Sequence, residues 1–253
     1  MGVSRGKLVG VTNDGPVRII TIDRPRRRNA IDRPTADELE RSFAAFDEDE
    51  SALVAVLTGT GDTFCAGADL KAPGEGNASR FEPTGAAPLG PTRMFISKPV
   101  VAAIEGYAVA GGLELAIWCD LRVAASNAKI GVACRRWGLP LADGGTVRLP
   151  RLIGQGRALD LILTGREVSG DEAHAMGLVD RVTPPGEALG VARDLARLIA
   201  EHPQYCLKND RRSTYEQWTL PAPEALANEF RWAQDSLANG DPAEGVRRFT
   251  GTP

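Results

Sequence analysis

Residues 100–120 hold the feature that most limits how this chain can fold: an apolar run, a glycine pair, and a second apolar run broken by one acidic residue. The run 100–104 predicts a buried strand, and Gly111 and Gly112 open an expected buried helix with Glu114 in its first turn. Such a turn presents free N–H groups and the positive end of a helix dipole. A carboxylate there can move protons beside an oxyanion. Helix capping and a tight turn explain the same residues, and the segment alone favours that structural interpretation.

A second glycine-rich segment, residues 58–71, strengthens the catalytic interpretation. It follows residues 53–57, a short apolar run that predicts a buried strand. The small residues at 66–68 allow a ligand to approach the backbone closely. Asp69, which comes next, suits the start of a short helix.

Several common enzyme classes fit this sequence poorly. Gly59 and Gly61 give half of a dinucleotide-binding fingerprint, but Phe64 stands where its third glycine should be. The chain has two histidines, His174 and His202, and neither an H-E-x-x-H nor a G-x-S-x-G motif. An enzyme of this composition has to work with carboxylates and backbone amides.

The length and charge fit a globular protein that does not bind nucleic acid. A chain of 253 residues suits one large domain, or one domain with an appended helical part. The net charge of −3 gives no overall basic field. Residues 24–28 hold four arginines and are the best candidate for binding phosphates. We find no signal peptide, no membrane span and no C-x-x-C pair, which predicts a cytoplasmic protein with reduced thiols.

The pattern along the chain predicts a mixed α/β core over residues 1–185 and a helical C-terminal part over residues 186–253. The expected strands are 9–12, 17–22, 53–57, 100–104, 120–125 and 178–182. One helix is expected to begin at residue 111, and the other expected helices are 32–46, 145–152, 155–163, 169–175, 187–201, 203–218, 223–238 and 242–248. Residues 72–91 predict a mobile surface loop. Large aromatic residues in the C-terminal part either pack on their own domain or form a subunit surface: Trp218, Phe230, Trp232 and Phe249.

Over nearly its whole length the chain resembles the crotonase superfamily, which is also called the enoyl-CoA hydratase/isomerase family. The resemblance is carried by residues 24–30, 64–71, 98–115, 119–120, 144–149, 163–165, 172–179 and 241–245. It implies an α/β fold that is a spiral of ββα repeats, followed by an α-helical trimerisation region. It also implies an acyl-CoA thioester as ligand, with assembly into a homotrimer or homohexamer.

The resemblance also assigns roles to particular residues. The backbone N–H groups of Ala68 and Gly111 would form an oxyanion hole for the thioester carbonyl, and Glu114 corresponds to the first of two glutamates that hydratases of the family use. The substrate path would include Arg24, Arg26, Arg28, Ala66, Ala68, Asp69, Leu70, Lys71, Gly111, Gly112 and Cys134. No metal and no cofactor beyond the CoA of the substrate is expected.

The sequence departs from the hydratase pattern at one position. Cys134 stands where the family's second glutamate is expected, and a protonated thiol is a poor group for activating water. In a second, less favoured interpretation, the positive charges of Arg135 and Arg136 stabilise Cys134 as a thiolate. Asp143 lies where some relatives carry an active-site aspartate, so it is either a second catalytic carboxylate or the N-cap of the helix that follows.

Three functions remain open at this point. The leading one is hydration of a 2-enoyl-CoA in lipid metabolism. Double-bond isomerisation is the close alternative, because it needs only one carboxylate to move a proton between two carbons. A non-catalytic acyl-CoA-binding protein is the third, and the retention of Glu114, Asp143 and both glycine turns argues against it.

Overall fold

The structure, a computed structural model, describes residues 7–239 and 241–251. The chain divides into two compact units, one ending at Ala196 and the other beginning at Arg197, so the division falls within helix α6 (Ala188–Ala200). The sequence pattern predicts the boundary between the core and the helical C-terminal part at residues 185 and 186. The first unit holds the sheets, and the second holds the C-terminal helices.

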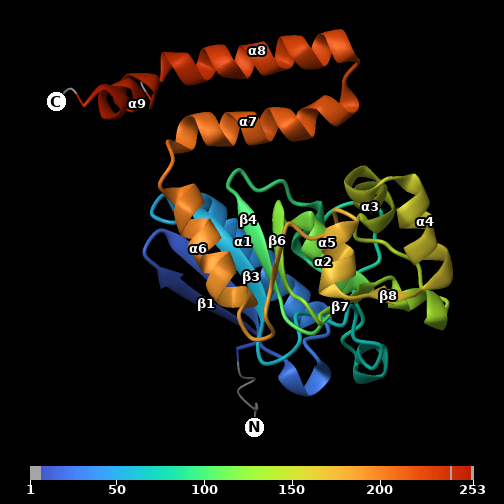
Figure 1. Ribbon diagram of the computed structural model, residues 1–253. Helices are drawn as coiled ribbons and strands as arrows, with labels where there is room; N and C mark the ends of the chain where they lie inside the picture. The colour runs from blue at the N-terminus through green and yellow to red at the C-terminus, as the bar shows by residue number, and fades with distance from the viewer. Residues whose placement is uncertain (1–6, 240, 252–253) are drawn as a thin grey trace. The chain divides into compact units, whose positions relative to one another are not determined.

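A six-stranded sheet forms the centre of the first unit, in the strand order β1-β2-β3-β4-β6-β9 (Figure 1). β1 and β2 form an antiparallel hairpin, and the other neighbouring pairs are parallel. Gly15 makes the predicted hairpin turn with a φ of 58°. The strands are β1 (Val9–Asp14), β2 (Val17–Ile22), β3 (Val54–Gly59), β4 (Val100–Ile104), β6 (Leu121–Ala125) and β9 (Arg181–Thr183).

A second, three-stranded sheet was not predicted. It consists of β5 (Tyr107–Val109), β7 (Lys129–Gly131) and β8 (Glu167–Val168), and these strands are too short to show a period in the sequence. The predicted strand at 178–182 is wrong for its first residues. The carbonyl of Leu178 accepts a hydrogen bond from Arg122 Nε at 2.7 Å, and β9 begins only at Arg181.

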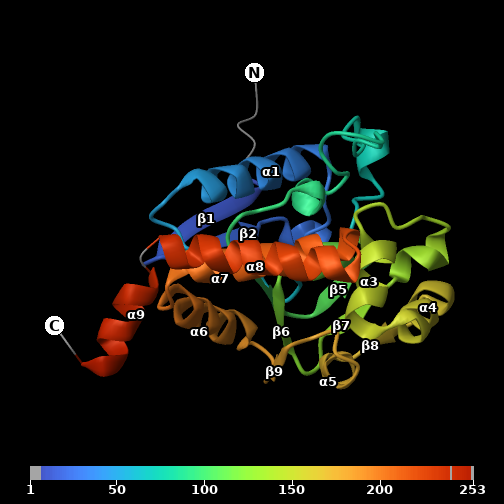
Figure 2. The ribbon, with the colours of Figure 1, turned by 90° about the horizontal axis from the view of Figure 1, so that it is seen from above.

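Helix α1 (Arg33–Glu48) lies alongside β1 and β2 (Figure 2). Its N-cap is Asp32, whose side chain accepts a hydrogen bond from Thr35 N at 3.0 Å. Phe43 lies on the buried face of α1 and meets the Trp118 ring edge-on, at 4.8 Å between centroids. This contact ties α1 to the end of α2 (Gly111–Trp118).

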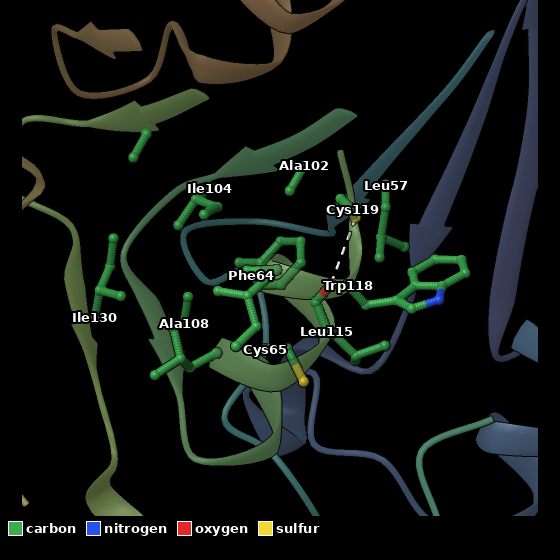
Figure 3. Close-up of a cluster of buried hydrophobic side chains, with 14 of the residues drawn as sticks. Leu57, Phe64, Cys65, Ala102, Ile104, Ala108, Leu115, Trp118, Cys119 and Ile130 are labelled. Carbon is green, nitrogen blue, oxygen red and sulfur yellow. Dashed lines mark hydrogen bonds between the residues drawn. The ribbon is translucent and has the colours of Figure 1, made fainter. Parts of the chain in front are cut away.

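Every residue of α2 is buried, and apart from Glu114 its residues are apolar on all sides of the helix. Figure 3 shows Leu115 and Trp118 of this helix among other buried hydrophobic side chains. Leu115 packs in a core with Leu57, Phe64 and Ile104, which come from β3, the segment after it and β4. Gly112 has no room for a side chain, because a Cβ there would lie 2.0 Å from the carbonyl oxygen of Cys65. The glycine pair therefore lets α2 enter the core directly against the second glycine-rich segment.

The remaining helices follow the sequence prediction within one or two residues. They are α3 (Gly145–Ile153), α4 (Gln155–Thr164), α5 (Gly170–Ala175), α6, α7 (Gln204–Glu216), α8 (Ala222–Ala238) and α9 (Asp241–Thr250). The predicted mobile loop 72–91 is partly wrong, because it contains the short helix η2 (Ala72–Glu75) and residues 87–90 are buried. No helix in the described part of the chain is long and apolar enough to span a bilayer.

Candidate active site

The start of α2 places Glu114 and the Gly111 amide at one wall of a cavity. The residue before the helix, Ala110, has φ 55° and ψ −124°, a backbone conformation that residues other than glycine rarely adopt. This strained turn directs the chain from β5 into α2 and leaves the first N–H of the helix without an intrahelical acceptor. Glu114 follows within the first turn and is 2% exposed.

The carboxylate of Glu114 is held by the N-terminus of another helix. Its Oε1 accepts hydrogen bonds from Asp143 N at 2.8 Å and from Gly145 N at 2.9 Å, where α3 begins. Burial raises the pKa of Glu114 to about 7, and the two amide donors limit that rise. A carboxyl group with this pKa can either accept or donate a proton near neutral pH.

Asp143 lies beside Glu114 and ties a neighbouring loop to the site. Its Oδ1 accepts hydrogen bonds from Leu89 N at 3.0 Å and from Thr92 Oγ1 at 2.6 Å. The interpretation of Asp143 as an N-cap is wrong, because Gly144 occupies the cap of α3 and no side chain caps it. Burial raises the pKa of Asp143 as well, although the hydrogen bond from Thr92 opposes the rise.

Cys134 also lines the cavity, from the short helix η4 (Ala133–Trp137), and is 7% exposed. Burial raises the pKa of its thiol, and the negative charge of Glu114 adds to the rise. The basic residue Arg136 is turned away to Glu167, at 3.2 Å. Arg135 lowers the pKa of the Cys134 thiol, but by less than burial raises it, so the net shift disfavours the thiolate near neutral pH.

The two proposed oxyanion donors lie on turns that touch each other. A Cβ on Gly67 would lie 2.9 Å from Gly111 N, so only glycine allows this approach. Ala68 pairs with Ile31 in a parallel bridge, in which Ile31 N bonds to Gly67 O and Asp69 N bonds to Ile31 O, each at 2.8 Å. This pairing points the N–H of Ala68 away from Ile31. Within the described chain, neither Ala68 nor Gly111 donates a backbone hydrogen bond.

These groups share one cavity of about 890 Å³, a size suited to a large organic ligand. Glu114, Cys134 and Asp143 contribute its reactive groups. The predicted residues Arg26, Arg28, Ala66, Ala68, Asp69, Leu70, Lys71 and Gly111 also line it. Among the described residues, no cluster of side chains suits a metal ion.

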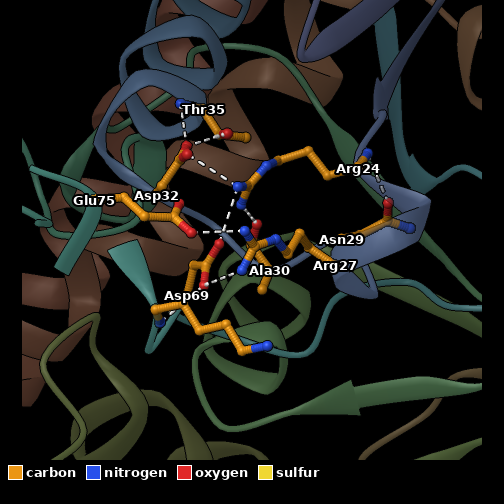
Figure 4. A network of polar contacts seen from close by, with 9 residues as sticks. Arg24, Arg27, Asn29, Ala30, Asp32, Thr35, Asp69 and Glu75 are labelled. Carbon is orange, nitrogen blue, oxygen red and sulfur yellow. Dashed lines mark hydrogen bonds and ion pairs between the residues drawn. The ribbon is translucent and has the colours of Figure 1, made fainter. Parts of the chain in front are cut away.

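Two predicted ligand residues do not line the cavity. Arg24 points inward, where its Nη2 lies 2.9 Å from Asp32 Oδ2 and 2.9 Å from Asp69 Oδ2, so we do not assign it to ligand phosphates (Figure 4). Gly112 is packed against the Cys65 carbonyl and serves the fold rather than the ligand.

Sequence reasoning missed part of the cavity lining. Arg27, Leu89, Trp137 and Leu139 all line it. Arg27 was within the basic cluster that indicated phosphate binding. Trp137 ends the short helix η4, and Leu89 and Leu139 lie outside helices and strands. Segments this short or irregular show no period in the sequence.

Comparison with known proteins identifies the class to which this fold and site belong. The enoyl-CoA hydratase/isomerase family model matches residues 12–252, and the chain belongs to that family. The predicted membership of the crotonase superfamily is thereby confirmed.

Individual relatives agree with this assignment. The chain is 41% identical over 250 residues to a carnitinyl-CoA dehydratase of Salmonella agona, covering 94% of each protein. It is 33% identical over 242 residues to a short-chain-enoyl-CoA hydratase of Clostridium acetobutylicum, covering 93% of this chain and 92% of that protein. The solved structure of enoyl-CoA hydratase EchA1 from Mycobacterium marinum superposes with a TM-score of 0.91, at 35% identity and 96% coverage of both chains. The predicted fold class is therefore confirmed.

Proposed function

We propose that this protein adds water reversibly to the double bond of a 2-enoyl-CoA. The observation that carries the proposal is the position of Glu114, a buried carboxylate with a pKa of about 7, in the same cavity as two backbone N–H groups without an internal acceptor. A general base is most effective when its pKa lies near the working pH.

In the proposed reaction the thioester oxygen accepts hydrogen bonds from Ala68 N and Gly111 N. Glu114 takes a proton from water as the water oxygen bonds to Cβ, and the π electrons move onto the thioester oxygen. A protonated Asp143 carboxyl group gives its proton to Cα as the thioester re-forms, and the proton taken up by Glu114 then passes back to Asp143, so that the net change is the addition of one water. Losing one such donor typically costs about 2.7–4 kcal/mol of transition-state stabilisation.

We assign the second acid–base role to Asp143 rather than to Cys134. Both line the cavity beside Glu114. The raised pKa of the Cys134 thiol favours its protonated form near neutral pH, and a protonated thiol is a poor group for activating water, whereas Asp143 supplies a carboxyl group that burial makes a better proton acceptor than an ordinary aspartate.

The charged rim of the cavity suits the CoA part of the substrate. Arg26, Arg28 and Lys71 are exposed and line the cavity, so their cations are available to the phosphates of CoA. The proposed reaction moves only water and protons, so it requires no cofactor besides the CoA of the substrate.

Double-bond isomerisation is the second candidate, and the neutral thiol of Cys134 favours it. With a single carboxylate, Glu114 can take a proton from one carbon of the acyl chain and return it to another. This reaction does not require Asp143, whereas hydration in our proposal requires both carboxylates.

The direct test presents purified protein with crotonyl-CoA and, separately, with a β,γ-enoyl-CoA. The proposal predicts a product heavier by one water from crotonyl-CoA. A β,γ-enoyl-CoA that is converted to its α,β isomer, together with crotonyl-CoA that stays unhydrated, would replace the first proposal with the second. Saturable binding without either product would indicate a non-catalytic acyl-CoA-binding protein.

We further propose that the second unit forms subunit contacts in a homotrimer or homohexamer. Phe230 on α8 is 65% exposed and Phe249 on α9 is 92% exposed, and Trp218 is also exposed. Large exposed apolar side chains of this kind support an interaction surface. Light scattering should give the mass of three or six chains, and a monomer at micromolar concentration would contradict this.

A role in lipid metabolism and a cytoplasmic location stay predictions of the sequence.

A further inference from the structure

We propose that Arg24 is a positioning residue that fixes the oxyanion donor Ala68, although Arg24 does not line the cavity. The inference rests on the proposed function, because it gives the Ala68 amide a catalytic role. It starts from a network of buried charges beneath the second glycine-rich segment (Figure 4).

Arg24 joins two chain segments that are far apart in the sequence. Its Nη2 lies 2.9 Å from Asp32 Oδ2 and 2.9 Å from Asp69 Oδ2, and its Nη1 donates to the carbonyl of Ala30. The Arg24 side chain is 10% exposed, and both carboxylates are more deeply buried. The contact with Asp69 is therefore a charge-assisted hydrogen bond away from bulk water.

The contacts of Arg24 surround the bridge that orients Ala68. Ile31 pairs with Ala68, and Arg24 binds the residues on both sides of Ile31 as well as the residue that follows Ala68. Asp69 N also donates to Ile31 O at 2.8 Å. The orientation of the Ala68 N–H thus depends on two constraints that act on the same peptides: the backbone pairing with Ile31, and the contacts of Arg24 with Ala30, Asp32 and Asp69.

The local sequence explains why the turn that holds Ala68 needs an additional constraint from Arg24. The turn consists of Ala66, Gly67 and Ala68, whose small side chains make few contacts, and Gly67 adopts a φ of 93°. Small residues leave the cavity open to a ligand, but they cannot fix a peptide plane by packing. The adjacent ion pair supplies the constraint that the turn lacks.

Removing the guanidinium also leaves two buried carboxylates facing each other. The oxygens of Asp32 and Asp69 that share Nη2 can be no farther apart than twice the 2.9 Å distance. Asp69 would keep a longer ion pair, 3.9 Å from its Oδ1 to Arg27 Nη1, which compensates the repulsion between the two carboxylates less well than the shared guanidinium of Arg24 does. Their repulsion acts to separate the Ile31 segment from the Ala68 segment and so to turn the oxyanion donor.

The test compares Arg24→Met with Arg26→Met, a matched variant of an exposed arginine that lines the cavity. The readouts are kcat and KM with crotonyl-CoA, Kd for free CoA, and the infrared band of the carbonyl in bound butyryl-CoA labelled with carbon-13. Arg24→Met should lower kcat by about 10-fold or more. It should also move the carbonyl band back towards its position in free butyryl-CoA and leave Kd for CoA within about twofold.

Arg26→Met should show the opposite pattern, with weaker CoA binding and an unchanged carbonyl band. A folded Arg24→Met protein with the wild-type carbonyl band and kcat would overturn the inference, as would weaker CoA binding as its only defect. If Arg24→Met does not fold, Arg24→Lys tests the same point, because it keeps the charge but loses the planar fork, and its carbonyl band should lie between those of wild type and the free ligand. If wild type itself does not shift the carbonyl band of bound butyryl-CoA, no oxyanion hole acts on the carbonyl. That result would contradict the proposed function, and it is distinct from a result in which wild type and Arg24→Met shift the band equally.

Discussion

Replacing Glu114 with glutamine should abolish turnover and at the same time stabilise the protein at alkaline pH. Glu114 is 2% exposed, and its pKa of about 7 lies well above the ordinary value of 4.5. A carboxyl group whose pKa is raised on folding favours the folded state at low pH. That contribution is lost as the pH rises from the unfolded pKa through the folded pKa.

The size of the effect follows from the shift. Each pKa unit corresponds to about 1.4 kcal/mol, so the ionised Glu114 costs on the order of 3 kcal/mol of folding free energy at about pH 8 and about 1 kcal/mol or less at about pH 5. Glutamine keeps an oxygen that can accept from Asp143 N and Gly145 N, but it carries no charge.

The assay is urea unfolding of wild type and Glu114→Gln at both pH values, together with turnover of crotonyl-CoA. The stability gained by the variant should grow with pH over this range, and turnover should fall by about 10²-fold or more. A stability difference that does not change with pH would refute the raised pKa. Turnover near the wild-type level would refute the catalytic role.

Three further predictions follow from the site. The kcat/KM of wild type should fall as the pH drops below about 7, since the base Glu114 must be ionised, and a flat profile down to about pH 5 would contradict this. Ala68→Pro removes one oxyanion N–H and should lower kcat by about 10²–10³-fold in a folded protein, whereas unchanged turnover would remove Ala68 from the site. Asp143→Asn should lower kcat by about 10²-fold while Cys134→Ala has little effect, and a Cys134→Ala protein as inactive as Glu114→Gln would place the thiol in the mechanism.

The sequence predicted the long elements well, and its three candidate reactive groups, Glu114, Cys134 and Asp143, line one cavity. Hydrophobic period located α1, an apolar run after a glycine pair located α2, and Glu114 beside that pair drew attention to the chemistry. Spatial pairing could not be predicted in the same way. Nothing in the sequence joins Glu114 to the amide of Asp143, 29 positions later, and strands of two or three residues such as β8 show no period.

Arg24 shows why the basic cluster misled the prediction. Four arginines within five residues indicate a phosphate site, but one of the two carboxylates that bind Arg24 belongs to Asp69, 45 positions away. Which arginine faces the ligand and which faces the interior is decided by that long-range contact. Local sequence carries no information about it, so Arg24, Arg26 and Arg28 looked equivalent until the fold separated them.

The central claim is that Glu114 drives the addition of water to an enoyl-CoA bound between the two glycine turns. The measurement that tests it most directly is the incubation of crotonyl-CoA in water enriched with oxygen-18, with wild type and Glu114→Gln in parallel, followed by mass spectrometry of the product. The account predicts labelled oxygen at Cβ of the 3-hydroxyacyl-CoA with wild type, and at least about 10²-fold slower incorporation with the variant. Equal incorporation by both proteins, or none by wild type, would contradict it.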